Sequence, residues 1–191
     1  MRQKGQIIVI VAFLIMVGLF LLALLADGGR LYLLRTRSQR SAQAAADAGM
    51  GLVAEQMVTL AVPRQTQAAG LSPCTPDGDF GDTGATCTAT PEPAEIAHWL
   101  TDEDRQAMVE PEVQSTVEAL ALDYANRNEF SSSDPSVLEL QADYPYMYQL
   151  EAENIRLRVI IRKRAVVLLA GLLGQEFVDV PAEAISELPQ R

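Results

Sequence analysis

The chain has 191 residues, a formal net charge of −10 and 49% hydrophobic residues. Its acidic side chains are concentrated between Glu92 and Glu153, a stretch in which Arg105 and Arg127 are the only arginines and no lysine occurs. An acidic surface repels nucleic acid, which argues against a DNA- or RNA-binding protein. The length leaves room for one modest domain beside a membrane segment.

Residues Ile7 to Ala26 form an apolar run, IIVIVAFLIMVGLFLLALLA, without a charged side chain. At about 1.5 Å per residue, a helix of this length covers about 30 Å, the hydrocarbon thickness of a bilayer. The alternative is a cleaved secretory signal, because Arg2 and Lys4 precede the run. However, the run is longer than the apolar region of such signals, and no small-x-small cleavage site follows directly. Residues 1–26 are therefore predicted to be a cytoplasmic tip and a retained transmembrane helix.

The helical pattern continues beyond Asp27 in a segment rich in Ala, Leu, Gln and Arg, with no proline before Pro63. These residues favour helix, so residues 27–62 are predicted to be a stem helix continuous with the anchor. Small side chains allow neighbouring helices to approach closely. We expect a helix-packing interface with partner subunits at the small residues Ala12, Gly18, Ala23, Ala42, Ala45 and Ala46.

Residues 63–112 are rich in Pro, Gly and Asp and contain both cysteines, Cys74 and Cys87. Neither cysteine has a CxxC partner or a neighbouring histidine, which argues against a zinc site. Two cysteines bracketing one loop predict a disulfide formed in an oxidising compartment; two unpaired thiols are the alternative. We expect this stretch to be an insertion between the stem and the head.

Motifs of catalysis and cofactor binding are missing from the sequence. It contains no GxSxG serine motif, no GxGxxG motif and no P-loop. Its one histidine, His98, has no carboxylate or thiol at a catalytic spacing. The acidic loop residues Asp77, Asp79 and Asp82 depart from the EF-hand pattern, and calcium binding there stays an open alternative. We expect no enzyme, no cofactor, no other metal and no small-molecule substrate.

Residues 113–191 are expected to form an α+β head, a small antiparallel sheet with a helix. Ser115–Asn128 has the period of an amphipathic helix. Strand-like patterns occur in Val137–Asp143, Tyr146–Lys163 and Phe177–Val180. Ala165–Leu173 is apolar all round but too short to span a bilayer, so we expect a buried helix or one lying on the membrane surface.

Four arginines occupy one face of the predicted central strand. Because successive side chains of a strand point to opposite sides, the apolar residues from Ile155 to Ile161 share one face. The other face carries Arg156, Arg158, Arg162 and Arg164. These arginines are candidates either for contact with anionic lipid headgroups or for ion pairs with acidic residues of the same chain.

Several short motifs resemble the TadE/TadG-like Flp pilus-assembly proteins. Gly5-Gln6 precedes the apolar run, Asp27-Gly28-Gly29-Arg30-Leu31-Tyr32 follows it, and the alanine-rich Ala42–Gly49 comes next. Ala121–Asn128 and Val159–Ser186 are similar to later parts of that family. The resemblance implies a type IV pilin-like N-terminal helix and an exterior α+β head, as in a minor pilin or pseudopilin. It makes Gly5 a candidate processing site for a prepilin peptidase.

The expected function is therefore structural. The chain is predicted to be a single-pass envelope protein that scaffolds or initiates a Tad/Flp pilus or another membrane complex. Its expected partners are membrane lipid and other membrane-protein subunits, contacted through the transmembrane and stem helices. The N-terminus is expected in the cytoplasm and the C-terminal domain in the periplasm or outside the cell. The alternative is an accessory structural subunit of a large respiratory or photosynthetic membrane complex.

Overall fold

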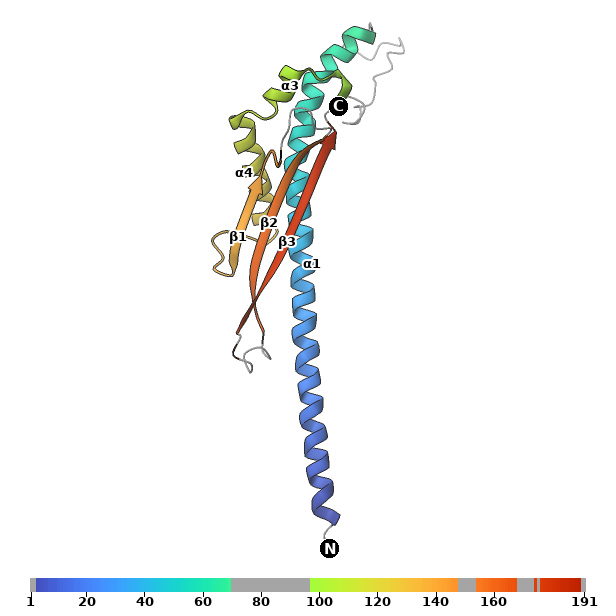
Figure 1. The fold of residues 1–191 in the computed structure, drawn as a ribbon, viewed down its shortest axis with the longest axis vertical. Coiled ribbons are helices and arrows are strands. Elements are labelled where there is room, and N and C mark those ends of the chain that lie inside the picture. The colour runs from blue at the N-terminus through green and yellow to red at the C-terminus, as the bar shows by residue number, and fades with distance from the viewer. Residues whose placement is uncertain (1–2, 70–96, 148–153, 168–173, 175, 190–191) are drawn as a thin grey trace, which may run out of the picture.

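The computed structural model describes residues 3–69, 97–147, 154–167, 174 and 176–189, with the side chains of the first range described over residues 8–64. A long helix, α1 (Gln3–Ala69), carries a head of three short helical elements and a sheet. Figure 1 shows the head lying along the C-terminal half of α1, while the N-terminal half extends away from it. The head consists of η1 (Ala97–Trp99), α3 (Asp102–Ala107), α4 (Pro111–Arg127), β1 (Val137–Asp143), β2 (Asn154–Val166) and β3 (Phe177–Pro189).

Helix α1 joins the predicted anchor and stem in one uninterrupted helix. It passes through Gly28 and Gly29 without a break, and it includes Pro63 near its end. Beyond the membrane run, its fully buried side chains recur at spacings of three and four residues, which places them on one stripe of the helix. This stripe consists of Ala42, Ala45, Ala46, Met50, Val53, Met57 and Ala61. The continuous helix predicted from sequence is confirmed, and it extends beyond the predicted stem.

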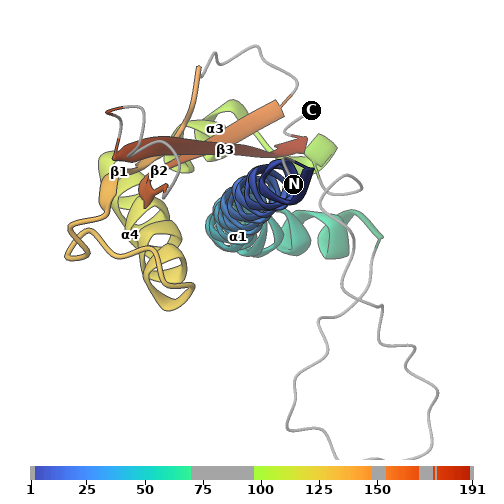
Figure 2. The same ribbon diagram turned by 90° about the horizontal axis from the view of Figure 1, so that it is seen from below.

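The sheet is antiparallel in the order β1-β2-β3, as expected for an α+β head. The alternation predicted for the central strand is observed, since Ile155, Leu157, Val159 and Ile161 are each at most 1% exposed. Helices α1 and α4 lie on the same face of the sheet (Figure 2) and cover these side chains. The core of the protein thus lies between the sheet and two helices.

The ends of two strands differ from the sequence-based expectation. Strand β2 begins at Asn154 rather than Tyr146, and it continues to Val166 because Ala165 and Val166 pair with β3. The helix predicted to begin at Ala165 is therefore wrong in its first two residues, and residues 168–173 lie outside the described range. An apolar run that is buried in a sheet has the same composition as a buried helix, so the pattern alone does not separate them.

Strand β3 extends to Pro189, well past the predicted end at Val180. Two prolines, Pro181 and Pro189, lie within it. Proline lacks a backbone N–H and is tolerated on an edge strand, which is the position β3 has among the described strands. The strand pattern was hidden in the sequence because the buried side chains after Val180 are only alanines, Ala182 and Ala184.

Candidate membrane and assembly interface

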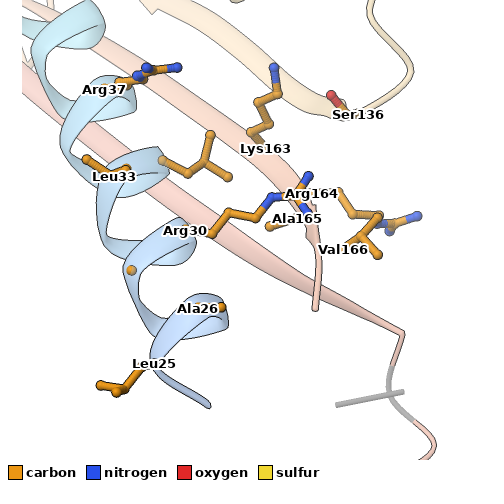
Figure 3. A pocket seen from close by; sticks show the side chains of 12 residues that line it. Leu25, Ala26, Arg30, Leu33, Arg37, Ser136, Lys163, Arg164, Ala165 and Val166 are labelled. Carbon is orange, nitrogen blue, oxygen red and sulfur yellow. The ribbon is translucent and has the colours of Figure 1, made fainter. Parts of the chain in front are cut away.

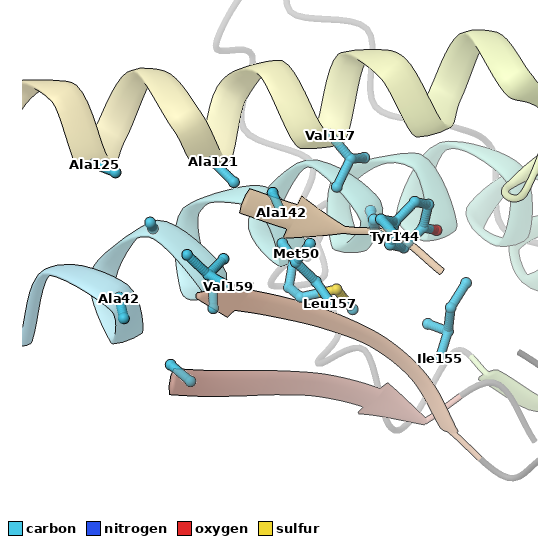
Figure 4. Close-up of a cluster of buried hydrophobic side chains, with 14 of the residues drawn as sticks. Ala42, Met50, Val117, Ala121, Ala125, Ala142, Tyr144, Ile155, Leu157 and Val159 are labelled. Carbon is cyan, nitrogen blue, oxygen red and sulfur yellow. The ribbon is translucent and has the colours of Figure 1, made fainter. Parts of the chain in front are cut away.

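The stem alanines of the predicted packing interface contact the chain's own head. Ala42, Ala45 and Ala46 are 0% exposed. Figure 4 shows Ala42 in the same cluster as Ala121 and Ala125 of α4 and apolar side chains of the sheet. These three alanines are therefore covered within the chain and do not form a free surface for another subunit.

Gly49 lies where the stem packs tightly against the head. A Cβ atom added there would lie 3.3 Å from the carbonyl oxygen of Val117 and 3.4 Å from Cβ of Ala121, and it would overlap the side chain of Leu157. Leu157 is itself fully buried. The alanine-rich segment ending at Gly49 thus allows α1 to pack closely against α4 and β2.

An ion pair holds the far end of α1 to the start of the head. The guanidinium of Arg64 contacts both carboxylate oxygens of Asp104, with Nη2 3.1 Å from Oδ1, and it also donates to the carbonyl of Trp99. The carboxylate of Asp104 accepts from the backbone N–H of Thr101 at 2.8 Å, and the backbone N–H of Asp104 donates to the Thr101 hydroxyl at 3.3 Å, which forms a capping box at the start of α3. The Thr101 hydroxyl also donates to the Asp104 carboxylate at 2.7 Å. The hydrogen bond from Arg64, together with those from Thr101, lowers the pKa of Asp104.

The ion pair between Arg64 and Asp104 was not predicted from the sequence. The signal for the local part was present, since Thr101 and Asp104 have the spacing of a capping box. The pairing with Arg64 was not readable, because 40 residues separate Arg64 from Asp104 and both lie inside the predicted insertion, residues 63–112. The result is a polar link in addition to the apolar stripe.

The N-terminal half of α1, which contains the apolar run Ile7–Ala26 and is called the membrane half below, is not packed against any other described part of the chain. Its large apolar side chains are exposed to between 36% at Val17 and 71% at Ile8. Ala12 is exposed, Gly18 and Ala23 are partly buried, and a Cβ at Gly18 would meet nothing within 4 Å. Among the described residues, α1 is the one helix long and apolar enough to cross a membrane. This surface requires lipid or partner helices around it.

The arginine face of β2 forms ion pairs with the neighbouring strands. The sequence left open whether these arginines contact anionic lipid headgroups or pair with acidic residues of the same chain, and the structure shows the ion pairs within the chain. Pairs between partly exposed side chains contribute little, roughly 0–1 kcal/mol each. The pairs are Arg156–Glu187 at 3.0 Å, Arg158–Glu183 at 2.8 Å, Arg162–Glu139 at 3.1 Å and Arg164–Asp179 at 3.5 Å.

The remaining sequence-predicted residues take no part in the ion pairs described above or lie outside the described residues. His98 lies in η1 with its ring centroid 4.9 Å from that of Trp99. Gly5 belongs to α1. Within the described ranges, no group of three or more His, Cys, Asp or Glu side chains is arranged to hold a metal ion. The predicted cysteine pair and the acidic loop lie outside those ranges: Cys74, Cys87, Asp77, Asp79 and Asp82.

Comparison with known families agrees with the resemblance of the N-terminal motifs. The family model described as Flp pilus-assembly TadE/G-like matches residues 5–62, which is most of α1. No curated protein and no solved structure matches the chain. The family match supports involvement in Flp pilus assembly, and together with the apolar half of α1 it indicates membrane anchoring. Over residues 5–62, the chain is similar to the TadE/TadG-like Flp pilus-assembly proteins.

Proposed function

We propose that this chain is a single-pass envelope protein that scaffolds or initiates assembly of a Tad/Flp pilus, as a minor pilin or pseudopilin does. It acts by contact rather than by turnover. The membrane half of α1 packs against other membrane helices, and the head is held at a fixed height above the bilayer by the stem.

One observation carries this proposal: a single helix has an uncovered apolar half and a half that is buried in its own head. The large side chains of the first half are exposed, whereas the inner stripe of the second is fully buried. Because the stem is already packed internally, contact with neighbouring subunits falls to the membrane half and to the outer surface of the head. In the membrane half, Gly18 offers a small position, and small residues promote close helix association in lipid.

The proposed orientation places the N-terminus in the cytoplasm and everything after Asp27 in the periplasm or outside the cell. A disulfide between Cys74 and Cys87 belongs to this proposal, since such bonds persist in oxidising compartments. Basic residues flank both ends of the anchor and do not decide the orientation.

Cysteine labelling tests the orientation. In a chain carrying Cys74→Ser and Cys87→Ser, a cysteine replacing the exposed Ser132 should react with a membrane-impermeant maleimide on spheroplasts. A cysteine replacing Gln3 in the same background is the matched control and should react only after lysis. The reverse pattern would overturn the orientation. In the native chain, alkylation of denatured, unreduced protein should find no free thiol.

Substitution at Gly18 tests the contact function. Gly18→Leu adds a bulky side chain where no intramolecular contact exists, so the head should keep its unfolding midpoint in detergent. We expect this variant to lose co-purification with other pilus-assembly subunits and to lose pilus assembly. Gly18→Ala keeps a small side chain and should retain both. If Gly18→Leu assembles normally, or if the wild-type chain co-purifies with a respiratory or photosynthetic complex instead, the proposal is wrong.

A further inference from the structure

A groove lies between α1 and the end of β2, just beyond the membrane run. It has a volume of about 680 Å³ and is lined by one side of α1 between Leu25 and Arg37, by residues 163–166 of β2 and by Ser136. Figure 3 shows Arg30 extending from α1 towards β2, with Ala165 and Arg164 beside it. The groove is thus built by two elements that are distant in sequence.

The charge along this groove is entirely positive. Arg30, Arg37, Lys163 and Arg164 line it, and no acidic residue does. Lys163 and Arg164 also pair with carboxylates, at 3.0 Å to Asp134 and 3.5 Å to Asp179. In the part of the chain that the structure describes, Arg30 and Arg37 form no such pair. Two cations are therefore available for an anionic ligand.

The groove also has an apolar wall that continues into the membrane surface of α1. Leu25, Leu33 and Val166 line it and are all about half exposed or more. Leu25 belongs to the membrane run, and Arg30 is only four residues beyond Ala26, about 6 Å along a helix. That distance corresponds to the headgroup layer, which adds about 5–8 Å on each side of the hydrocarbon core. Arg30 and the apolar surface therefore meet at the height of lipid phosphates, and Arg37 lies about two helical turns further from the membrane.

We propose that this groove binds an anionic phospholipid of the leaflet on the side of the head. Its phosphate lies between Arg30 and Arg37, and its acyl chain follows Leu33 and Leu25 into the bilayer. A single molecule with an anionic head and an apolar tail satisfies both walls, whereas a free phosphate leaves the apolar wall uncovered. This inference rests on the proposed membrane anchoring of α1. The bound lipid would then help to hold the head at a fixed position relative to the bilayer.

Spin-labelled lipids provide the test. The full chain is reconstituted in phosphatidylcholine vesicles with a trace of spin-labelled phosphatidylglycerol or phosphatidylcholine, and the motionally restricted fraction is measured by electron paramagnetic resonance. A basic residue near the surface contributes up to about fivefold in affinity for anionic lipid. The wild-type chain should therefore prefer phosphatidylglycerol about fivefold or more. The double variant Arg30→Gln, Arg37→Gln should lose most of this preference.

Arg35→Gln is the matched control, because Arg35 lies between the two on the same helix but does not line the groove. It should retain the preference, and inorganic phosphate at constant ionic strength should not displace the restricted lipid. If Arg35→Gln weakens the preference as much as the double variant does, if phosphate abolishes it, or if wild type shows none, the lipid site is refuted. If no lipid of either kind is restricted, α1 is not in the bilayer, and the proposed anchoring fails with it.

Discussion

Gly49 determines how closely the stem approaches the head. Its missing side chain leaves room for the backbone of Val117 and the side chains of Ala121 and Leu157. Any side chain there would push α1 away from α4 and from the sheet, since a packed core leaves few voids. A glycine that weakens a helix in isolation is therefore favourable at this position.

Two glycine substitutions separate packing from helix propensity. Gly49→Ala should destabilise the head by about 1–3 kcal/mol, as expected for overpacking of a core. Gly51→Ala, two residues further on the same helix, meets nothing within 4 Å and should stabilise by up to about 1 kcal/mol. Urea unfolding of the full chain in detergent, followed by the fluorescence of Trp99, measures both. Equal stabilisation by the two variants would contradict the close packing at Gly49.

Asp104 makes the stability of the head depend on pH. Its pKa in the folded chain is lowered, chiefly by the hydrogen bond from Arg64. A lowered folded pKa means that the contribution is fully present above the unfolded pKa of about 3.9, and that it is lost as the pH falls from there towards the folded value. The pKa of Asp134, lowered to about 2 by Ser136 and Lys163, adds to the same acid dependence.

Asp104→Asn should cost about 1–2 kcal/mol at pH 7, because it removes a charged partner that solvent only partly screens at the half-exposed Arg64. The difference between wild type and variant should shrink between about pH 5 and pH 2. Asp123→Asn is the control, since it breaks an exposed helix pair with Arg127 worth about 0.3–0.5 kcal/mol. If the Asp104 variant had wild-type stability at pH 7, the ion pair between Arg64 and Asp104 would contribute nothing to the free energy of unfolding.

At the scale of elements, α1 combines two different environments in one helix. Its first half resembles a membrane span in composition, and its second half carries an alanine stripe that packs against α4 and the sheet. The sequence showed both parts clearly: the charge-free run predicted the anchor, and helix-favouring residues predicted its continuation. It did not show which surface covers the alanines, because small residues pack equally well against a partner subunit or against the same chain.

The strands likewise show which features a local sequence pattern predicts and which it does not. The alternation in β2 was readable because large aliphatic residues and arginines alternate almost strictly there, and β1 was readable from its run of aliphatic and polar residues. The second half of β3 was not readable, since alanines and prolines give little strand signal. Similarly, the partners of the arginine face and the groove beside Arg30 depend on which strands become neighbours, and no local pattern contains that information.

A bulky residue in the alanine stripe tests whether the stem is covered by its own head. Ala45→Phe should destabilise the full chain by several kcal/mol or prevent folding, because Ala45 is 0% exposed in a packed core. Ala44→Phe, one residue earlier on the exposed side of the helix, should unfold like wild type. Thermal unfolding in detergent compares them. Normal stability of Ala45→Phe would indicate that the stem is open and is covered only in an assembly.

At the scale of the whole molecule, we propose that the folded head is held on one helix whose apolar end remains available to the membrane and its proteins. The family match covers this helix and not the head, so the helix is the part that connects the chain to Flp pilus assembly.

Site-specific photo-cross-linking in pilus-forming cells tests this account most directly. A benzoylphenylalanine replacing Leu22, which is 64% exposed in the membrane half, should form adducts with other subunits of the pilus-assembly system. The same probe replacing Gln43, on the exposed side of the stem, reports contacts made outside the membrane. We expect adducts at Leu22 to disappear in the Gly18→Leu variant. Adducts at Leu22 only with subunits of a respiratory or photosynthetic complex, or none in cells that assemble pili, would contradict the account.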